Sequence, residues 1–532
     1  KQNRNGSSEW ILNQKPKKNA EICFKKLTED DQDLFTEAME KEIDSYLDHE
    51  AVAIATMNGI SPERLLGMRW VLTWKPIEDD QGKDIGHKAK ARLIIKGFQD
   101  PDLLHIKRDS PTLATSSRNM ILAIASTNQW QIEVGDIKTA FLNGDKTEEV
   151  RQIFADPPPE VRARLGMKDN EFLRVLKAIY GLLHAPKAWG EKLSQELVKM
   201  GWTTSKLEPC VWKLFGENQV LCGLIGAHVD DLLCTGAGKK YKAHIEALRK
   251  HFPFGSWTCS KDQTVVFCGC ELSQHADFSI TLQQERFSLS LDEIPLSRER
   301  KQHPEYPATN FEAKRMRGVL GGLSWRGVQS APWLCASISH LQGCHSSATV
   351  QDIMDVNKLV RSARKHAEVG LRFMTGIKDP IILTFSDASW ATRRDLSSQG
   401  GTLTMLTDSS IFSGCEAPFS VIGYVSRKLA RKARSSTSAE VQNCGNAVDQ
   451  HEFLKQVLFY FTNPQGIDLS SPEKDVAISK SGLIIDAKNM YDAISRIETS
   501  GLQLEEKRTA VECLGIKERI KKVNISLRWV DS

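Results

Sequence analysis

Two adjacent aspartates, Asp230 and Asp231, lie between short apolar runs, and this pattern is the strongest constraint on the fold of the chain. Leu224 to Val229 and Leu232 to Cys234 have the length and composition of buried strands, so the aspartates are expected at the tip of a tight hairpin. Side chains at such a tip point toward solvent or a metal ion. An ordinary Asp-Asp turn with no ligand is the alternative for this pair taken alone.

A third aspartate, Asp136, ends an upstream segment that alternates with period two from Trp130. In a strand, Trp130, Ile132, Val134 and Asp136 share one sheet face, with the aspartate at the open end. If this strand pairs with the hairpin, three carboxylates converge. Such a set can hold two hard cations roughly 3.5 to 4 Å apart, the arrangement used for phosphoryl transfer. The alternative for Asp136 is a solvated acid at a strand end.

Basic residues recur at even spacing from Lys88 to Lys96. In a strand, Lys88, Lys90, Arg92 and Lys96 share one face, while Leu93 and Ile95 point to the core. This face would suit a triphosphate. A lysine-rich solvated edge strand is the alternative for each single lysine.

The order of these segments resembles the polymerase region of copia-type (Pseudoviridae-like) LTR retrotransposon Pol polyproteins. Six segments carry the resemblance in family order: Lys88 to Phe98 ("KARLVAKGF"), Asp109 to Thr112 ("FSPV"), Val134 to Gly144 ("LDVKTAFLNG"), Ile179 to Trp189 ("LYGLKQAPRAW"), His228 to Leu232 ("YVDDI") and Phe267 to Leu272 ("FLGIEI"). A seventh lies near the C-terminus. The chain departs from the family at His184, where relatives have glutamine, and at His228, where they have tyrosine or a bulky apolar residue.

The resemblance implies an α/β (α+β) multidomain protein, with the fingers, palm and thumb of a right-hand polymerase followed by a ribonuclease H-like domain. The expected segments are a polar linker at 1–33, fingers and palm at 34–275, thumb and connection at 276–376, and a C-terminally truncated ribonuclease H-like domain at 377–532. The basic helical region from about Ile280 to Phe373 fits the thumb and connection. A separate helix is predicted from Phe35, Met39, Ile43 and Leu47 at four-residue steps.

The resemblance also implies residue roles. Asp136, Asp230 and Asp231 would be catalytic and bind two Mg²⁺ ions, with Mn²⁺ as a possible substitute. The implied nucleotide-binding residues are Lys90, Arg92, Phe141, Tyr180 and Gly181. Arg92 would contact the phosphates, and the Phe141 ring would stack under the sugar and exclude a 2′-hydroxyl.

Three acids near the C-terminus match the family's ribonuclease H metal ligands: Asp387, Glu440 and Asp486. Thr437 and Glu440 have the spacing of a capping box at the start of a helix. The fourth family carboxylate lies downstream of the segment that 527–532 resembles, so Asp531 is not expected to replace it. Ribonuclease H activity is therefore expected to be weak or absent.

The predicted function is RNA-directed DNA polymerase activity. The expected partners are an RNA template, a DNA or transfer RNA primer, an RNA–DNA hybrid and deoxynucleoside triphosphates, without a membrane, in a cytoplasmic retroelement particle or the nucleus. The alternative is a decayed or host-adopted remnant that acts only as a nucleic-acid-binding scaffold. With 532 residues and a net charge of +4, any nucleic-acid site must come from local basic clusters. The 12 scattered cysteines show no zinc spacing and are expected to be reduced.

Overall fold

The structure is a computed structural model that describes residues 21–78, 84–146, 152–500 and 506–531. Most of the polar linker predicted at the N-terminus lies outside these residues. The chain divides into two compact units. The first comprises Lys1–Pro111 and Lys138–Glu196, and the second comprises Thr112–Ile137 and Leu197–Ser532. Each is described by itself.

The first unit is built on a five-stranded sheet whose order is β1-β6-β5-β2-β3. The strands are β1 (Val52–Thr56), β2 (Leu65–Glu78), β3 (Asp84–Ile95), β5 (Phe154–Asp156) and β6 (Glu171–Val175). β2 and β3 form a long antiparallel hairpin in which Val71 is opposite Arg92. The basic strand predicted from Lys88 is therefore confirmed as β3, an edge strand, with Leu93 and Ile95 buried.

The helix predicted near the N-terminus is α2 (Glu29–Asp48), which packs against β3. It begins at Thr28, whose hydroxyl accepts a hydrogen bond from the Asp31 backbone N–H at 3.3 Å. Phe35, Met39 and Ile43 are buried as expected, but Leu47 is 42% exposed and Tyr46 is buried instead. A strict four-residue step drifts off the buried face because an α-helix repeats every 3.6 residues.

The remaining helices of this unit are α4 (Pro159–Leu165) and α5 (Ala185–Lys199), which continues beyond Glu196 into the second unit. Short 3₁₀ turns lie at η1 (Phe24–Lys26), η2 (Pro62–Arg64), η3 (Gly97–Gln99) and η4 (Ala140–Asn143).

The second unit begins with a sheet of order β10-β4-β9-β8-β7. Its strands are β4 (Gln131–Ile137), β7 (Val211–Phe215), β8 (Leu221–His228), β9 (Asp231–Gly236) and β10 (Phe254–Cys259). Helices α3 (Thr115–Thr127) and α6 (Gly238–His251) pack against β8. The aspartate hairpin and the alternating strand predicted from the sequence are thus β8–β9 and β4, and they are direct neighbours.

A second sheet follows, with β11 (Val265–Phe267), β12 (Cys270–Gln274), β13 (Ile280–Gln283) and β14 (Leu371–Phe373) in sequential order. Between β13 and β14 lie the helices α7 (Glu285–Leu289), α8 (Arg298–Lys301), α9 (Asn310–Ser330), α10 (Cys335–Gly343) and α11 (Val350–Lys365), together with η5 (Pro332–Leu334) and η6 (His345–Ser347). The helical region predicted from Ile280 to Phe373 therefore begins and ends in strands, which pair with each other.

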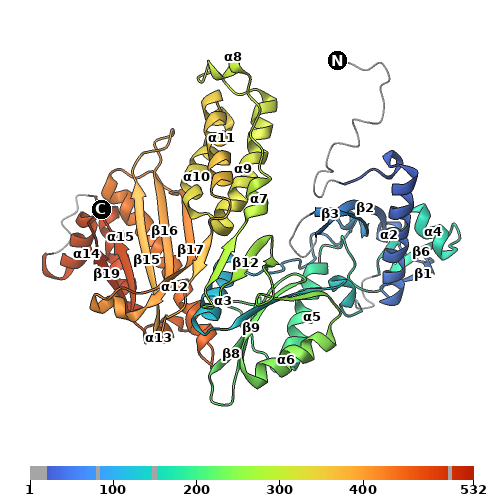
Figure 1. The fold of residues 1–532 in the computed structure, drawn as a ribbon, viewed down its shortest axis with the longest axis horizontal. Helices are drawn as coiled ribbons and strands as arrows, with labels where there is room; N and C mark the ends of the chain where they lie inside the picture. The colour runs from blue at the N-terminus through green and yellow to red at the C-terminus, as the bar shows by residue number, and fades with distance from the viewer. Residues whose placement is uncertain (1–20, 79–83, 147–151, 501–505, 532) are drawn as a thin grey trace. The chain divides into compact units, whose positions relative to one another are not determined.

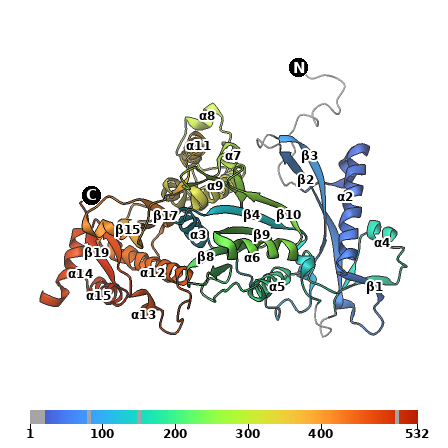
Figure 2. The same cartoon turned by 60° about the horizontal axis from the view of Figure 1, so that its bottom comes forward.

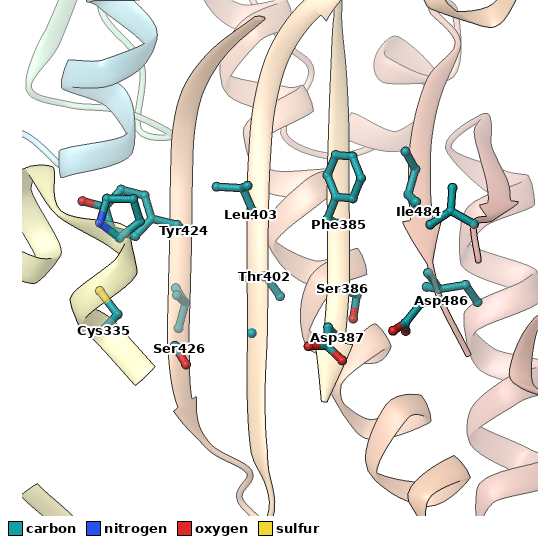
Figure 3. A pocket seen from close by; sticks show the side chains of 15 residues that line it. Cys335, Phe385, Ser386, Asp387, Thr402, Leu403, Tyr424, Ser426, Ile484 and Asp486 are labelled. Atoms are coloured by element: carbon teal, nitrogen blue, oxygen red, sulfur yellow. The ribbon is translucent and has the colours of Figure 1, made fainter. Parts of the chain in front are cut away.

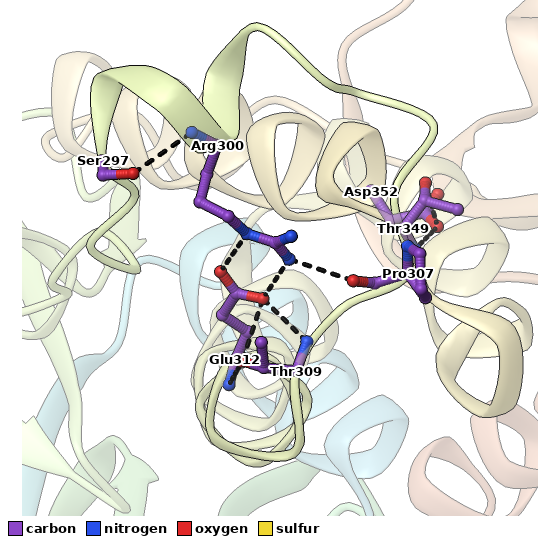
Figure 4. Close-up of polar contacts among 7 residues, drawn as sticks. All are labelled: Ser297, Arg300, Pro307, Thr309, Glu312, Thr349 and Asp352. Carbon is purple, nitrogen blue, oxygen red and sulfur yellow. Dashed lines mark hydrogen bonds and ion pairs between the residues drawn. The ribbon is translucent and has the colours of Figure 1, made fainter.

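Capping contacts define where these helices start (Figure 4). Thr309 and Glu312 form a capping box on α9, in which each side chain bonds the other residue's backbone N–H. The Arg300 guanidinium from α8 donates to both Glu312 carboxylate oxygens, at 2.7 and 3.2 Å, and to the Pro307 carbonyl at 2.9 Å. The Arg300 and Glu312 side chains therefore help to hold the start of α9.

The last sheet has the order β17-β16-β15-β18-β19. Its strands are β15 (Pro380–Ser389), β16 (Gln399–Asp408), β17 (Phe419–Lys428), β18 (Ser481–Ile485) and β19 (Ile525–Trp529). The long helix α12 (Ser436–Thr462) packs on β15 and β16, and α13 (Pro472–Val476), α14 (Lys488–Ser500) and α15 (Lys507–Lys522) pack against α12 (Figure 2). The η7 turn (Ser409–Ser413) connects β16 to β17.

The start of α12 differs from the prediction. Ser435 is the N-cap, and its hydroxyl accepts a hydrogen bond from the Ser438 backbone N–H at 3.1 Å. The capping box predicted from Thr437 and Glu440 is wrong because the helix begins two residues earlier, which leaves the Glu440 side chain available for other contacts.

Candidate functional site

Asp136, Asp230 and Asp231 lie at one end of the β10-β4-β9-β8-β7 sheet. Asp136 on β4 is directly opposite Asp231, the first residue of β9. Directly opposed residues on antiparallel strands have Cβ atoms roughly 4.5 to 5.5 Å apart. Asp230 precedes Asp231 in the hairpin turn, and its carbonyl accepts a hydrogen bond from the Ile137 N–H at 3.0 Å. The backbone ladder therefore brings the three residues to one sheet edge.

The turn that carries Asp230 has a strained backbone. His228 pairs with Asp231, so Val229 and Asp230 make a two-residue hairpin loop, and Val229 has a φ of 62°. A β-branched residue rarely adopts a positive φ, and such outliers concentrate at functional sites. Asp230 therefore lies in the loop, outside the strand pairing and next to Asp231.

Cys268 lies close to these aspartates and was not singled out from the sequence. It occupies the turn between β11 and β12, with a φ of 49°. Burial raises the pKa of its thiol to about 12, and the negative charge of Asp231 contributes to the shift. The segment from Phe267 to Leu272 resembles the family's "FLGIEI", and Cys268 stands where the family has leucine. This departure is the sequence feature that could have drawn attention to Cys268.

The expected nucleotide-binding residues are in the first unit, on β3, η4 and the segment before α5. The Arg92 guanidinium lies over the Tyr180 ring, 4.2 Å from its centroid. The Tyr180 and Phe141 rings meet edge to face, with centroids 5.1 Å apart. Gly181 has a φ of 98°, and a Cβ there would lie 2.1 Å from the Ile95 carbonyl oxygen. Lys90 lies on the same strand as Arg92 and is partly buried.

A second set of acids gathers in the C-terminal sheet. Within the part of the chain that the structure describes, Asp387, Glu440 and Asp486 are the one set of three acidic, histidine or cysteine ligands whose ligand atoms all lie within 4.8 Å of one another. Asp387 is on β15, Glu440 is on α12, and Asp486 follows β18. Figure 3 shows the two aspartates at the same end of the sheet face.

Electrostatics at this second set are unfavourable without a cation. Burial, with Asp387 as the next largest cause, raises the pKa of Glu440 to about 8. Burial and the charge of Asp486 also raise the pKa of Asp387. The Ala388 N–H donates to Glu440 at 3.1 Å and partly offsets this effect. Carboxylates held this close are suited to a divalent cation, which removes their repulsion.

An apolar hollow of about 410 Å³ adjoins these acids (Figure 3). Phe385, Leu403, Tyr424 and Ile484 line it, with Cys335 at its edge. Among the described residues, the close set of acids does not include Asp531. Among the described helices, none has the length and apolar character required to cross a membrane.

The family model described as "Reverse transcriptase (RNA-dependent DNA polymerase)" matches residues 57–294 of the chain. The chain's curated homologues are copia-type Pol polyproteins of plant retrotransposons, and their similarity covers most of the chain. The Retrovirus-related Pol polyprotein from transposon RE2 of Arabidopsis thaliana is 25% identical over 426 residues, 77% of this chain and 27% of the relative. That from transposon TNT 1-94 of Nicotiana tabacum is 28% identical over 252 residues, 46% of this chain and 18% of the relative.

The chain spans about a quarter of the length of the Arabidopsis relatives that it matches. Among solved structures, it is similar to the foamy viral protease-reverse transcriptase in complex with double-stranded DNA, with a TM-score of 0.50 and 10% identity over 93% of this chain and 69% of that chain. This likeness concerns the fold alone. The mixed α/β fold class expected from the sequence is confirmed, and it fits a polymerase followed by a ribonuclease H-like domain.

Proposed function

We propose that this chain is an RNA-directed DNA polymerase that extends a primer on an RNA template. The observation that carries the proposal is the direct pairing of Asp136 with Asp231, next to Asp230 in a strained turn, inside a segment that matches the reverse transcriptase family. The segments proposed from the sequence are kept: fingers and palm at 34–275, thumb and connection at 276–376, and a ribonuclease H-like domain at 377–532.

The donor set fits magnesium. Carboxylate oxygens are the ligands that hard cations prefer, and the three palm aspartates offer them from two adjacent backbone segments. Bound Mg²⁺ would neutralise charge on the reacting oxygens and on departing pyrophosphate. Asp136, Asp230 and Asp231 together would hold the ions next to the primer 3′-hydroxyl. Mn²⁺ has a similar preference and could substitute.

The residues proposed for nucleotide binding are Lys90, Arg92, Phe141, Tyr180 and Gly181. Arg92 suits a triphosphate because a guanidinium binds two oxygens at once. Phe141 would lie against the deoxyribose, where a 2′-hydroxyl would clash with the ring. Gly181 lets the loop approach β3 more closely than any other residue could.

Asp387, Glu440 and Asp486 are proposed as metal ligands of the ribonuclease H-like domain. Their carboxylates are close enough to share a cation. The partners follow from the polymerase function: RNA template, DNA or transfer RNA primer, hybrid product and deoxynucleotides. The implied location is a cytoplasmic particle, with the nucleus as the alternative.

The test is extension of a labelled DNA primer on an RNA template with Mg²⁺ and deoxynucleotides. The unmodified chain is expected to extend, and Asp230→Asn is expected to bind template-primer without extending it. Asp262→Asn, an exposed carboxylate in the turn after β10, serves as the matched control and is expected to extend normally. Template-primer binding without extension by the unmodified chain would instead favour a nucleic-acid-binding scaffold, an alternative that the histidines at 184 and 228 keep open.

A further inference from the structure

Three side chains from distant parts of the first unit form a continuous row of contacts. Arg92 comes from β3, Phe141 from η4 and Tyr180 from the segment before α5. Tyr180 is the central member: its ring face carries the Arg92 guanidinium at 4.2 Å, and its ring meets Phe141 at 5.1 Å with an interplanar angle of 66°. Both contacts have the favourable geometry of cation–π and edge-to-face pairs.

The backbone under Tyr180 is fixed to the edge of the sheet. The Tyr180 carbonyl accepts a hydrogen bond from the Ile95 N–H at 2.9 Å, on the side of β3 that has no neighbouring strand. The next residue, Gly181, approaches β3 so closely that no side chain fits between them. The ring is therefore attached to a backbone that cannot easily move away from Arg92.

Side chains of α2 complete this edge. The Tyr46 hydroxyl donates to the Leu93 carbonyl, and the Leu93 N–H donates to the Glu42 carboxylate at 3.3 Å. Burial raises the pKa of Glu42, and Arg92 is the largest influence opposing that rise. Glu42 is thus close enough to Arg92 for their charges to interact.

A side chain that excludes ribonucleotides, here called a sugar gate, must keep its position when the sugar contacts it. Phe141 excludes a ribose only if its ring cannot rotate away when a 2′-hydroxyl presses on it, and the described contacts place Tyr180 against that ring. Tyr180 is itself held by Arg92 on its face and by Ile95 at its backbone. The Tyr180 ring therefore contacts both Arg92, proposed to bind the phosphates, and Phe141, the proposed sugar gate.

We propose that Tyr180 is a specificity-determining residue. Its ring holds the Phe141 ring in place against ribonucleotides, a role here called the brace, and is itself held by Arg92. The inference rests on the proposed function and assigns sugar selectivity to a second residue besides Phe141. It contrasts with a purely structural role, in which loss of the ring would weaken deoxy- and ribonucleotide use alike.

The test compares kcat/KM for dATP and ATP in single-nucleotide extension. Tyr180→Leu is expected to lower the dATP/ATP ratio about tenfold, the size that follows from losing one edge-to-face and one cation–π contact. Tyr180→Phe retains both ring contacts and is expected to recover the ratio to within about threefold of the unmodified chain, on the same basis. An unchanged ratio in Tyr180→Leu, with equal losses for both nucleotides, overturns the proposal.

The matched control is Phe172→Leu. Phe172 on β6 also has an arginine over its ring, Arg162 at 5.5 Å. It lies in the same unit but is not part of the row of contacts formed by Arg92, Tyr180 and Phe141. Its loss is expected to leave the dATP/ATP ratio unchanged. A fall in the ratio equal to that of Tyr180→Leu would show a general effect of loosening the unit and would contradict the proposal.

Equilibrium dialysis of dATP and ATP with Mg²⁺ separates this inference from the polymerase function. A preference for dATP that Tyr180→Leu loses supports the brace even if no primer is extended, in which case only the proposed function fails. Extension by the unmodified chain with a ratio that does not depend on Tyr180 would leave the proposed function standing and overturn the brace. Failure of both extension and selective binding overturns both.

Discussion

The two acidic sites of the second unit are assembled in different ways. Asp136 and Asp231 are neighbours in a backbone ladder, and Asp230 is beside them in the hairpin turn. Asp387, Glu440 and Asp486 come from a strand, a helix and the end of another strand, and their oxygens are drawn within 4.8 Å of one another. Pairing of neighbouring strands places Asp136, Asp230 and Asp231, whereas packing of α12 on its sheet brings the C-terminal acids together.

This difference has an electrostatic consequence. Packing raises the pKa of Glu440 to about 8, because burial and its acidic neighbours disfavour the charged form. The C-terminal set is thus compact but costly to ionise without a cation. Asp136, Asp230 and Asp231 are instead positioned by the pairing of β4 with β9 and by the β8–β9 turn.

The largest expected effect tests the independence of the two sites. Asp136→Asn is expected to lower primer extension by about a thousandfold or more, since it removes a ligand of the proposed metal pair. Asp486→Asn is expected to leave extension within about twofold. Both variants are compared in the primer-extension assay, with cleavage of a labelled RNA–DNA hybrid measured alongside.

Two results would break this part of the comparison. Extension by Asp136→Asn would remove the palm assignment. Robust hybrid cleavage by the unmodified chain, lost in Asp486→Asn, would overturn the expectation that the C-terminal set is hydrolytically weak.

The next effect concerns the helix that carries Glu440. At the other end of α12, the buried Lys213 amine from β7 donates to the carbonyls of Tyr460 and Asn463, at 2.7 and 2.6 Å. Lys213→Met is expected to destabilise the second unit by about 2 to 3 kcal/mol, because these carbonyls lose a charged donor. Urea unfolding followed by circular dichroism measures the loss.

Lys239→Met, on the exposed side of α6, is the control and is expected to change the free energy of unfolding by less than about 0.5 kcal/mol. Burial lowers the pKa of Lys213 from 10.5 to about 8. The free energy of unfolding should therefore rise as the pH rises from about 8 to 10.5, because the unfolded chain then holds a proton that the folded chain has lost. Equal stability of the two variants would show that the hydrogen bonds of Lys213 do not stabilise the contact between β7 and the end of α12.

A smaller effect follows from the pKa of Glu440. Between its ordinary pKa of 4.5 and about 8, the folded chain retains a proton that the unfolded chain has lost, so the free energy of unfolding falls as pH rises through this window. Glu440→Gln removes that dependence. In the absence of metal it is expected to match the unmodified chain near pH 5 and to exceed it by roughly 1 to 2 kcal/mol at pH 8.5, a value reduced for partial solvent exposure.

Denaturation in EDTA at both pH values measures this difference. Glu416→Gln, an exposed acid in the loop before β17, should show no such pH dependence. If Glu440→Gln were no more stable at pH 8.5, burial and the neighbouring acids would not disfavour the charged Glu440, and the unfavourable electrostatics assigned to the C-terminal set would be wrong.

The smallest effect tests the strain in the palm turn. Val229→Gly is expected to stabilise the turn by up to about 1 kcal/mol, because glycine accepts a positive φ without a steric penalty, and to reduce extension by loosening Asp230. Gln219→Gly relieves a φ of 57° in the β7–β8 connection and should leave extension unchanged. Unchanged extension in both variants would show that strain at Val229 does not position Asp230.

Several features were predictable from the sequence because they depend on local pattern. Alternation from Trp130 predicted the strand that ends at Asp136, and the apolar runs around Asp230 predicted its hairpin. Even spacing predicted the basic face of β3. Where the exact phase of a helix mattered, the prediction failed: Tyr46 is buried in place of Leu47, and Ser435 caps α12 in place of Thr437.

By itself, the sequence determined the type of the elements around Asp136, Asp230 and Asp231, because apolar periodicity and turn residues act over a few positions. Only the tertiary structure decided which of these elements meet. Residues more than fifty positions apart, such as Asp387 and Glu440, are brought together by burial of α12 on its sheet, and the raised pKa of Glu440 follows from that burial. Tertiary structure also brings Arg92, Phe141 and Tyr180 together, because their contacts depend on packing that no local pattern specifies.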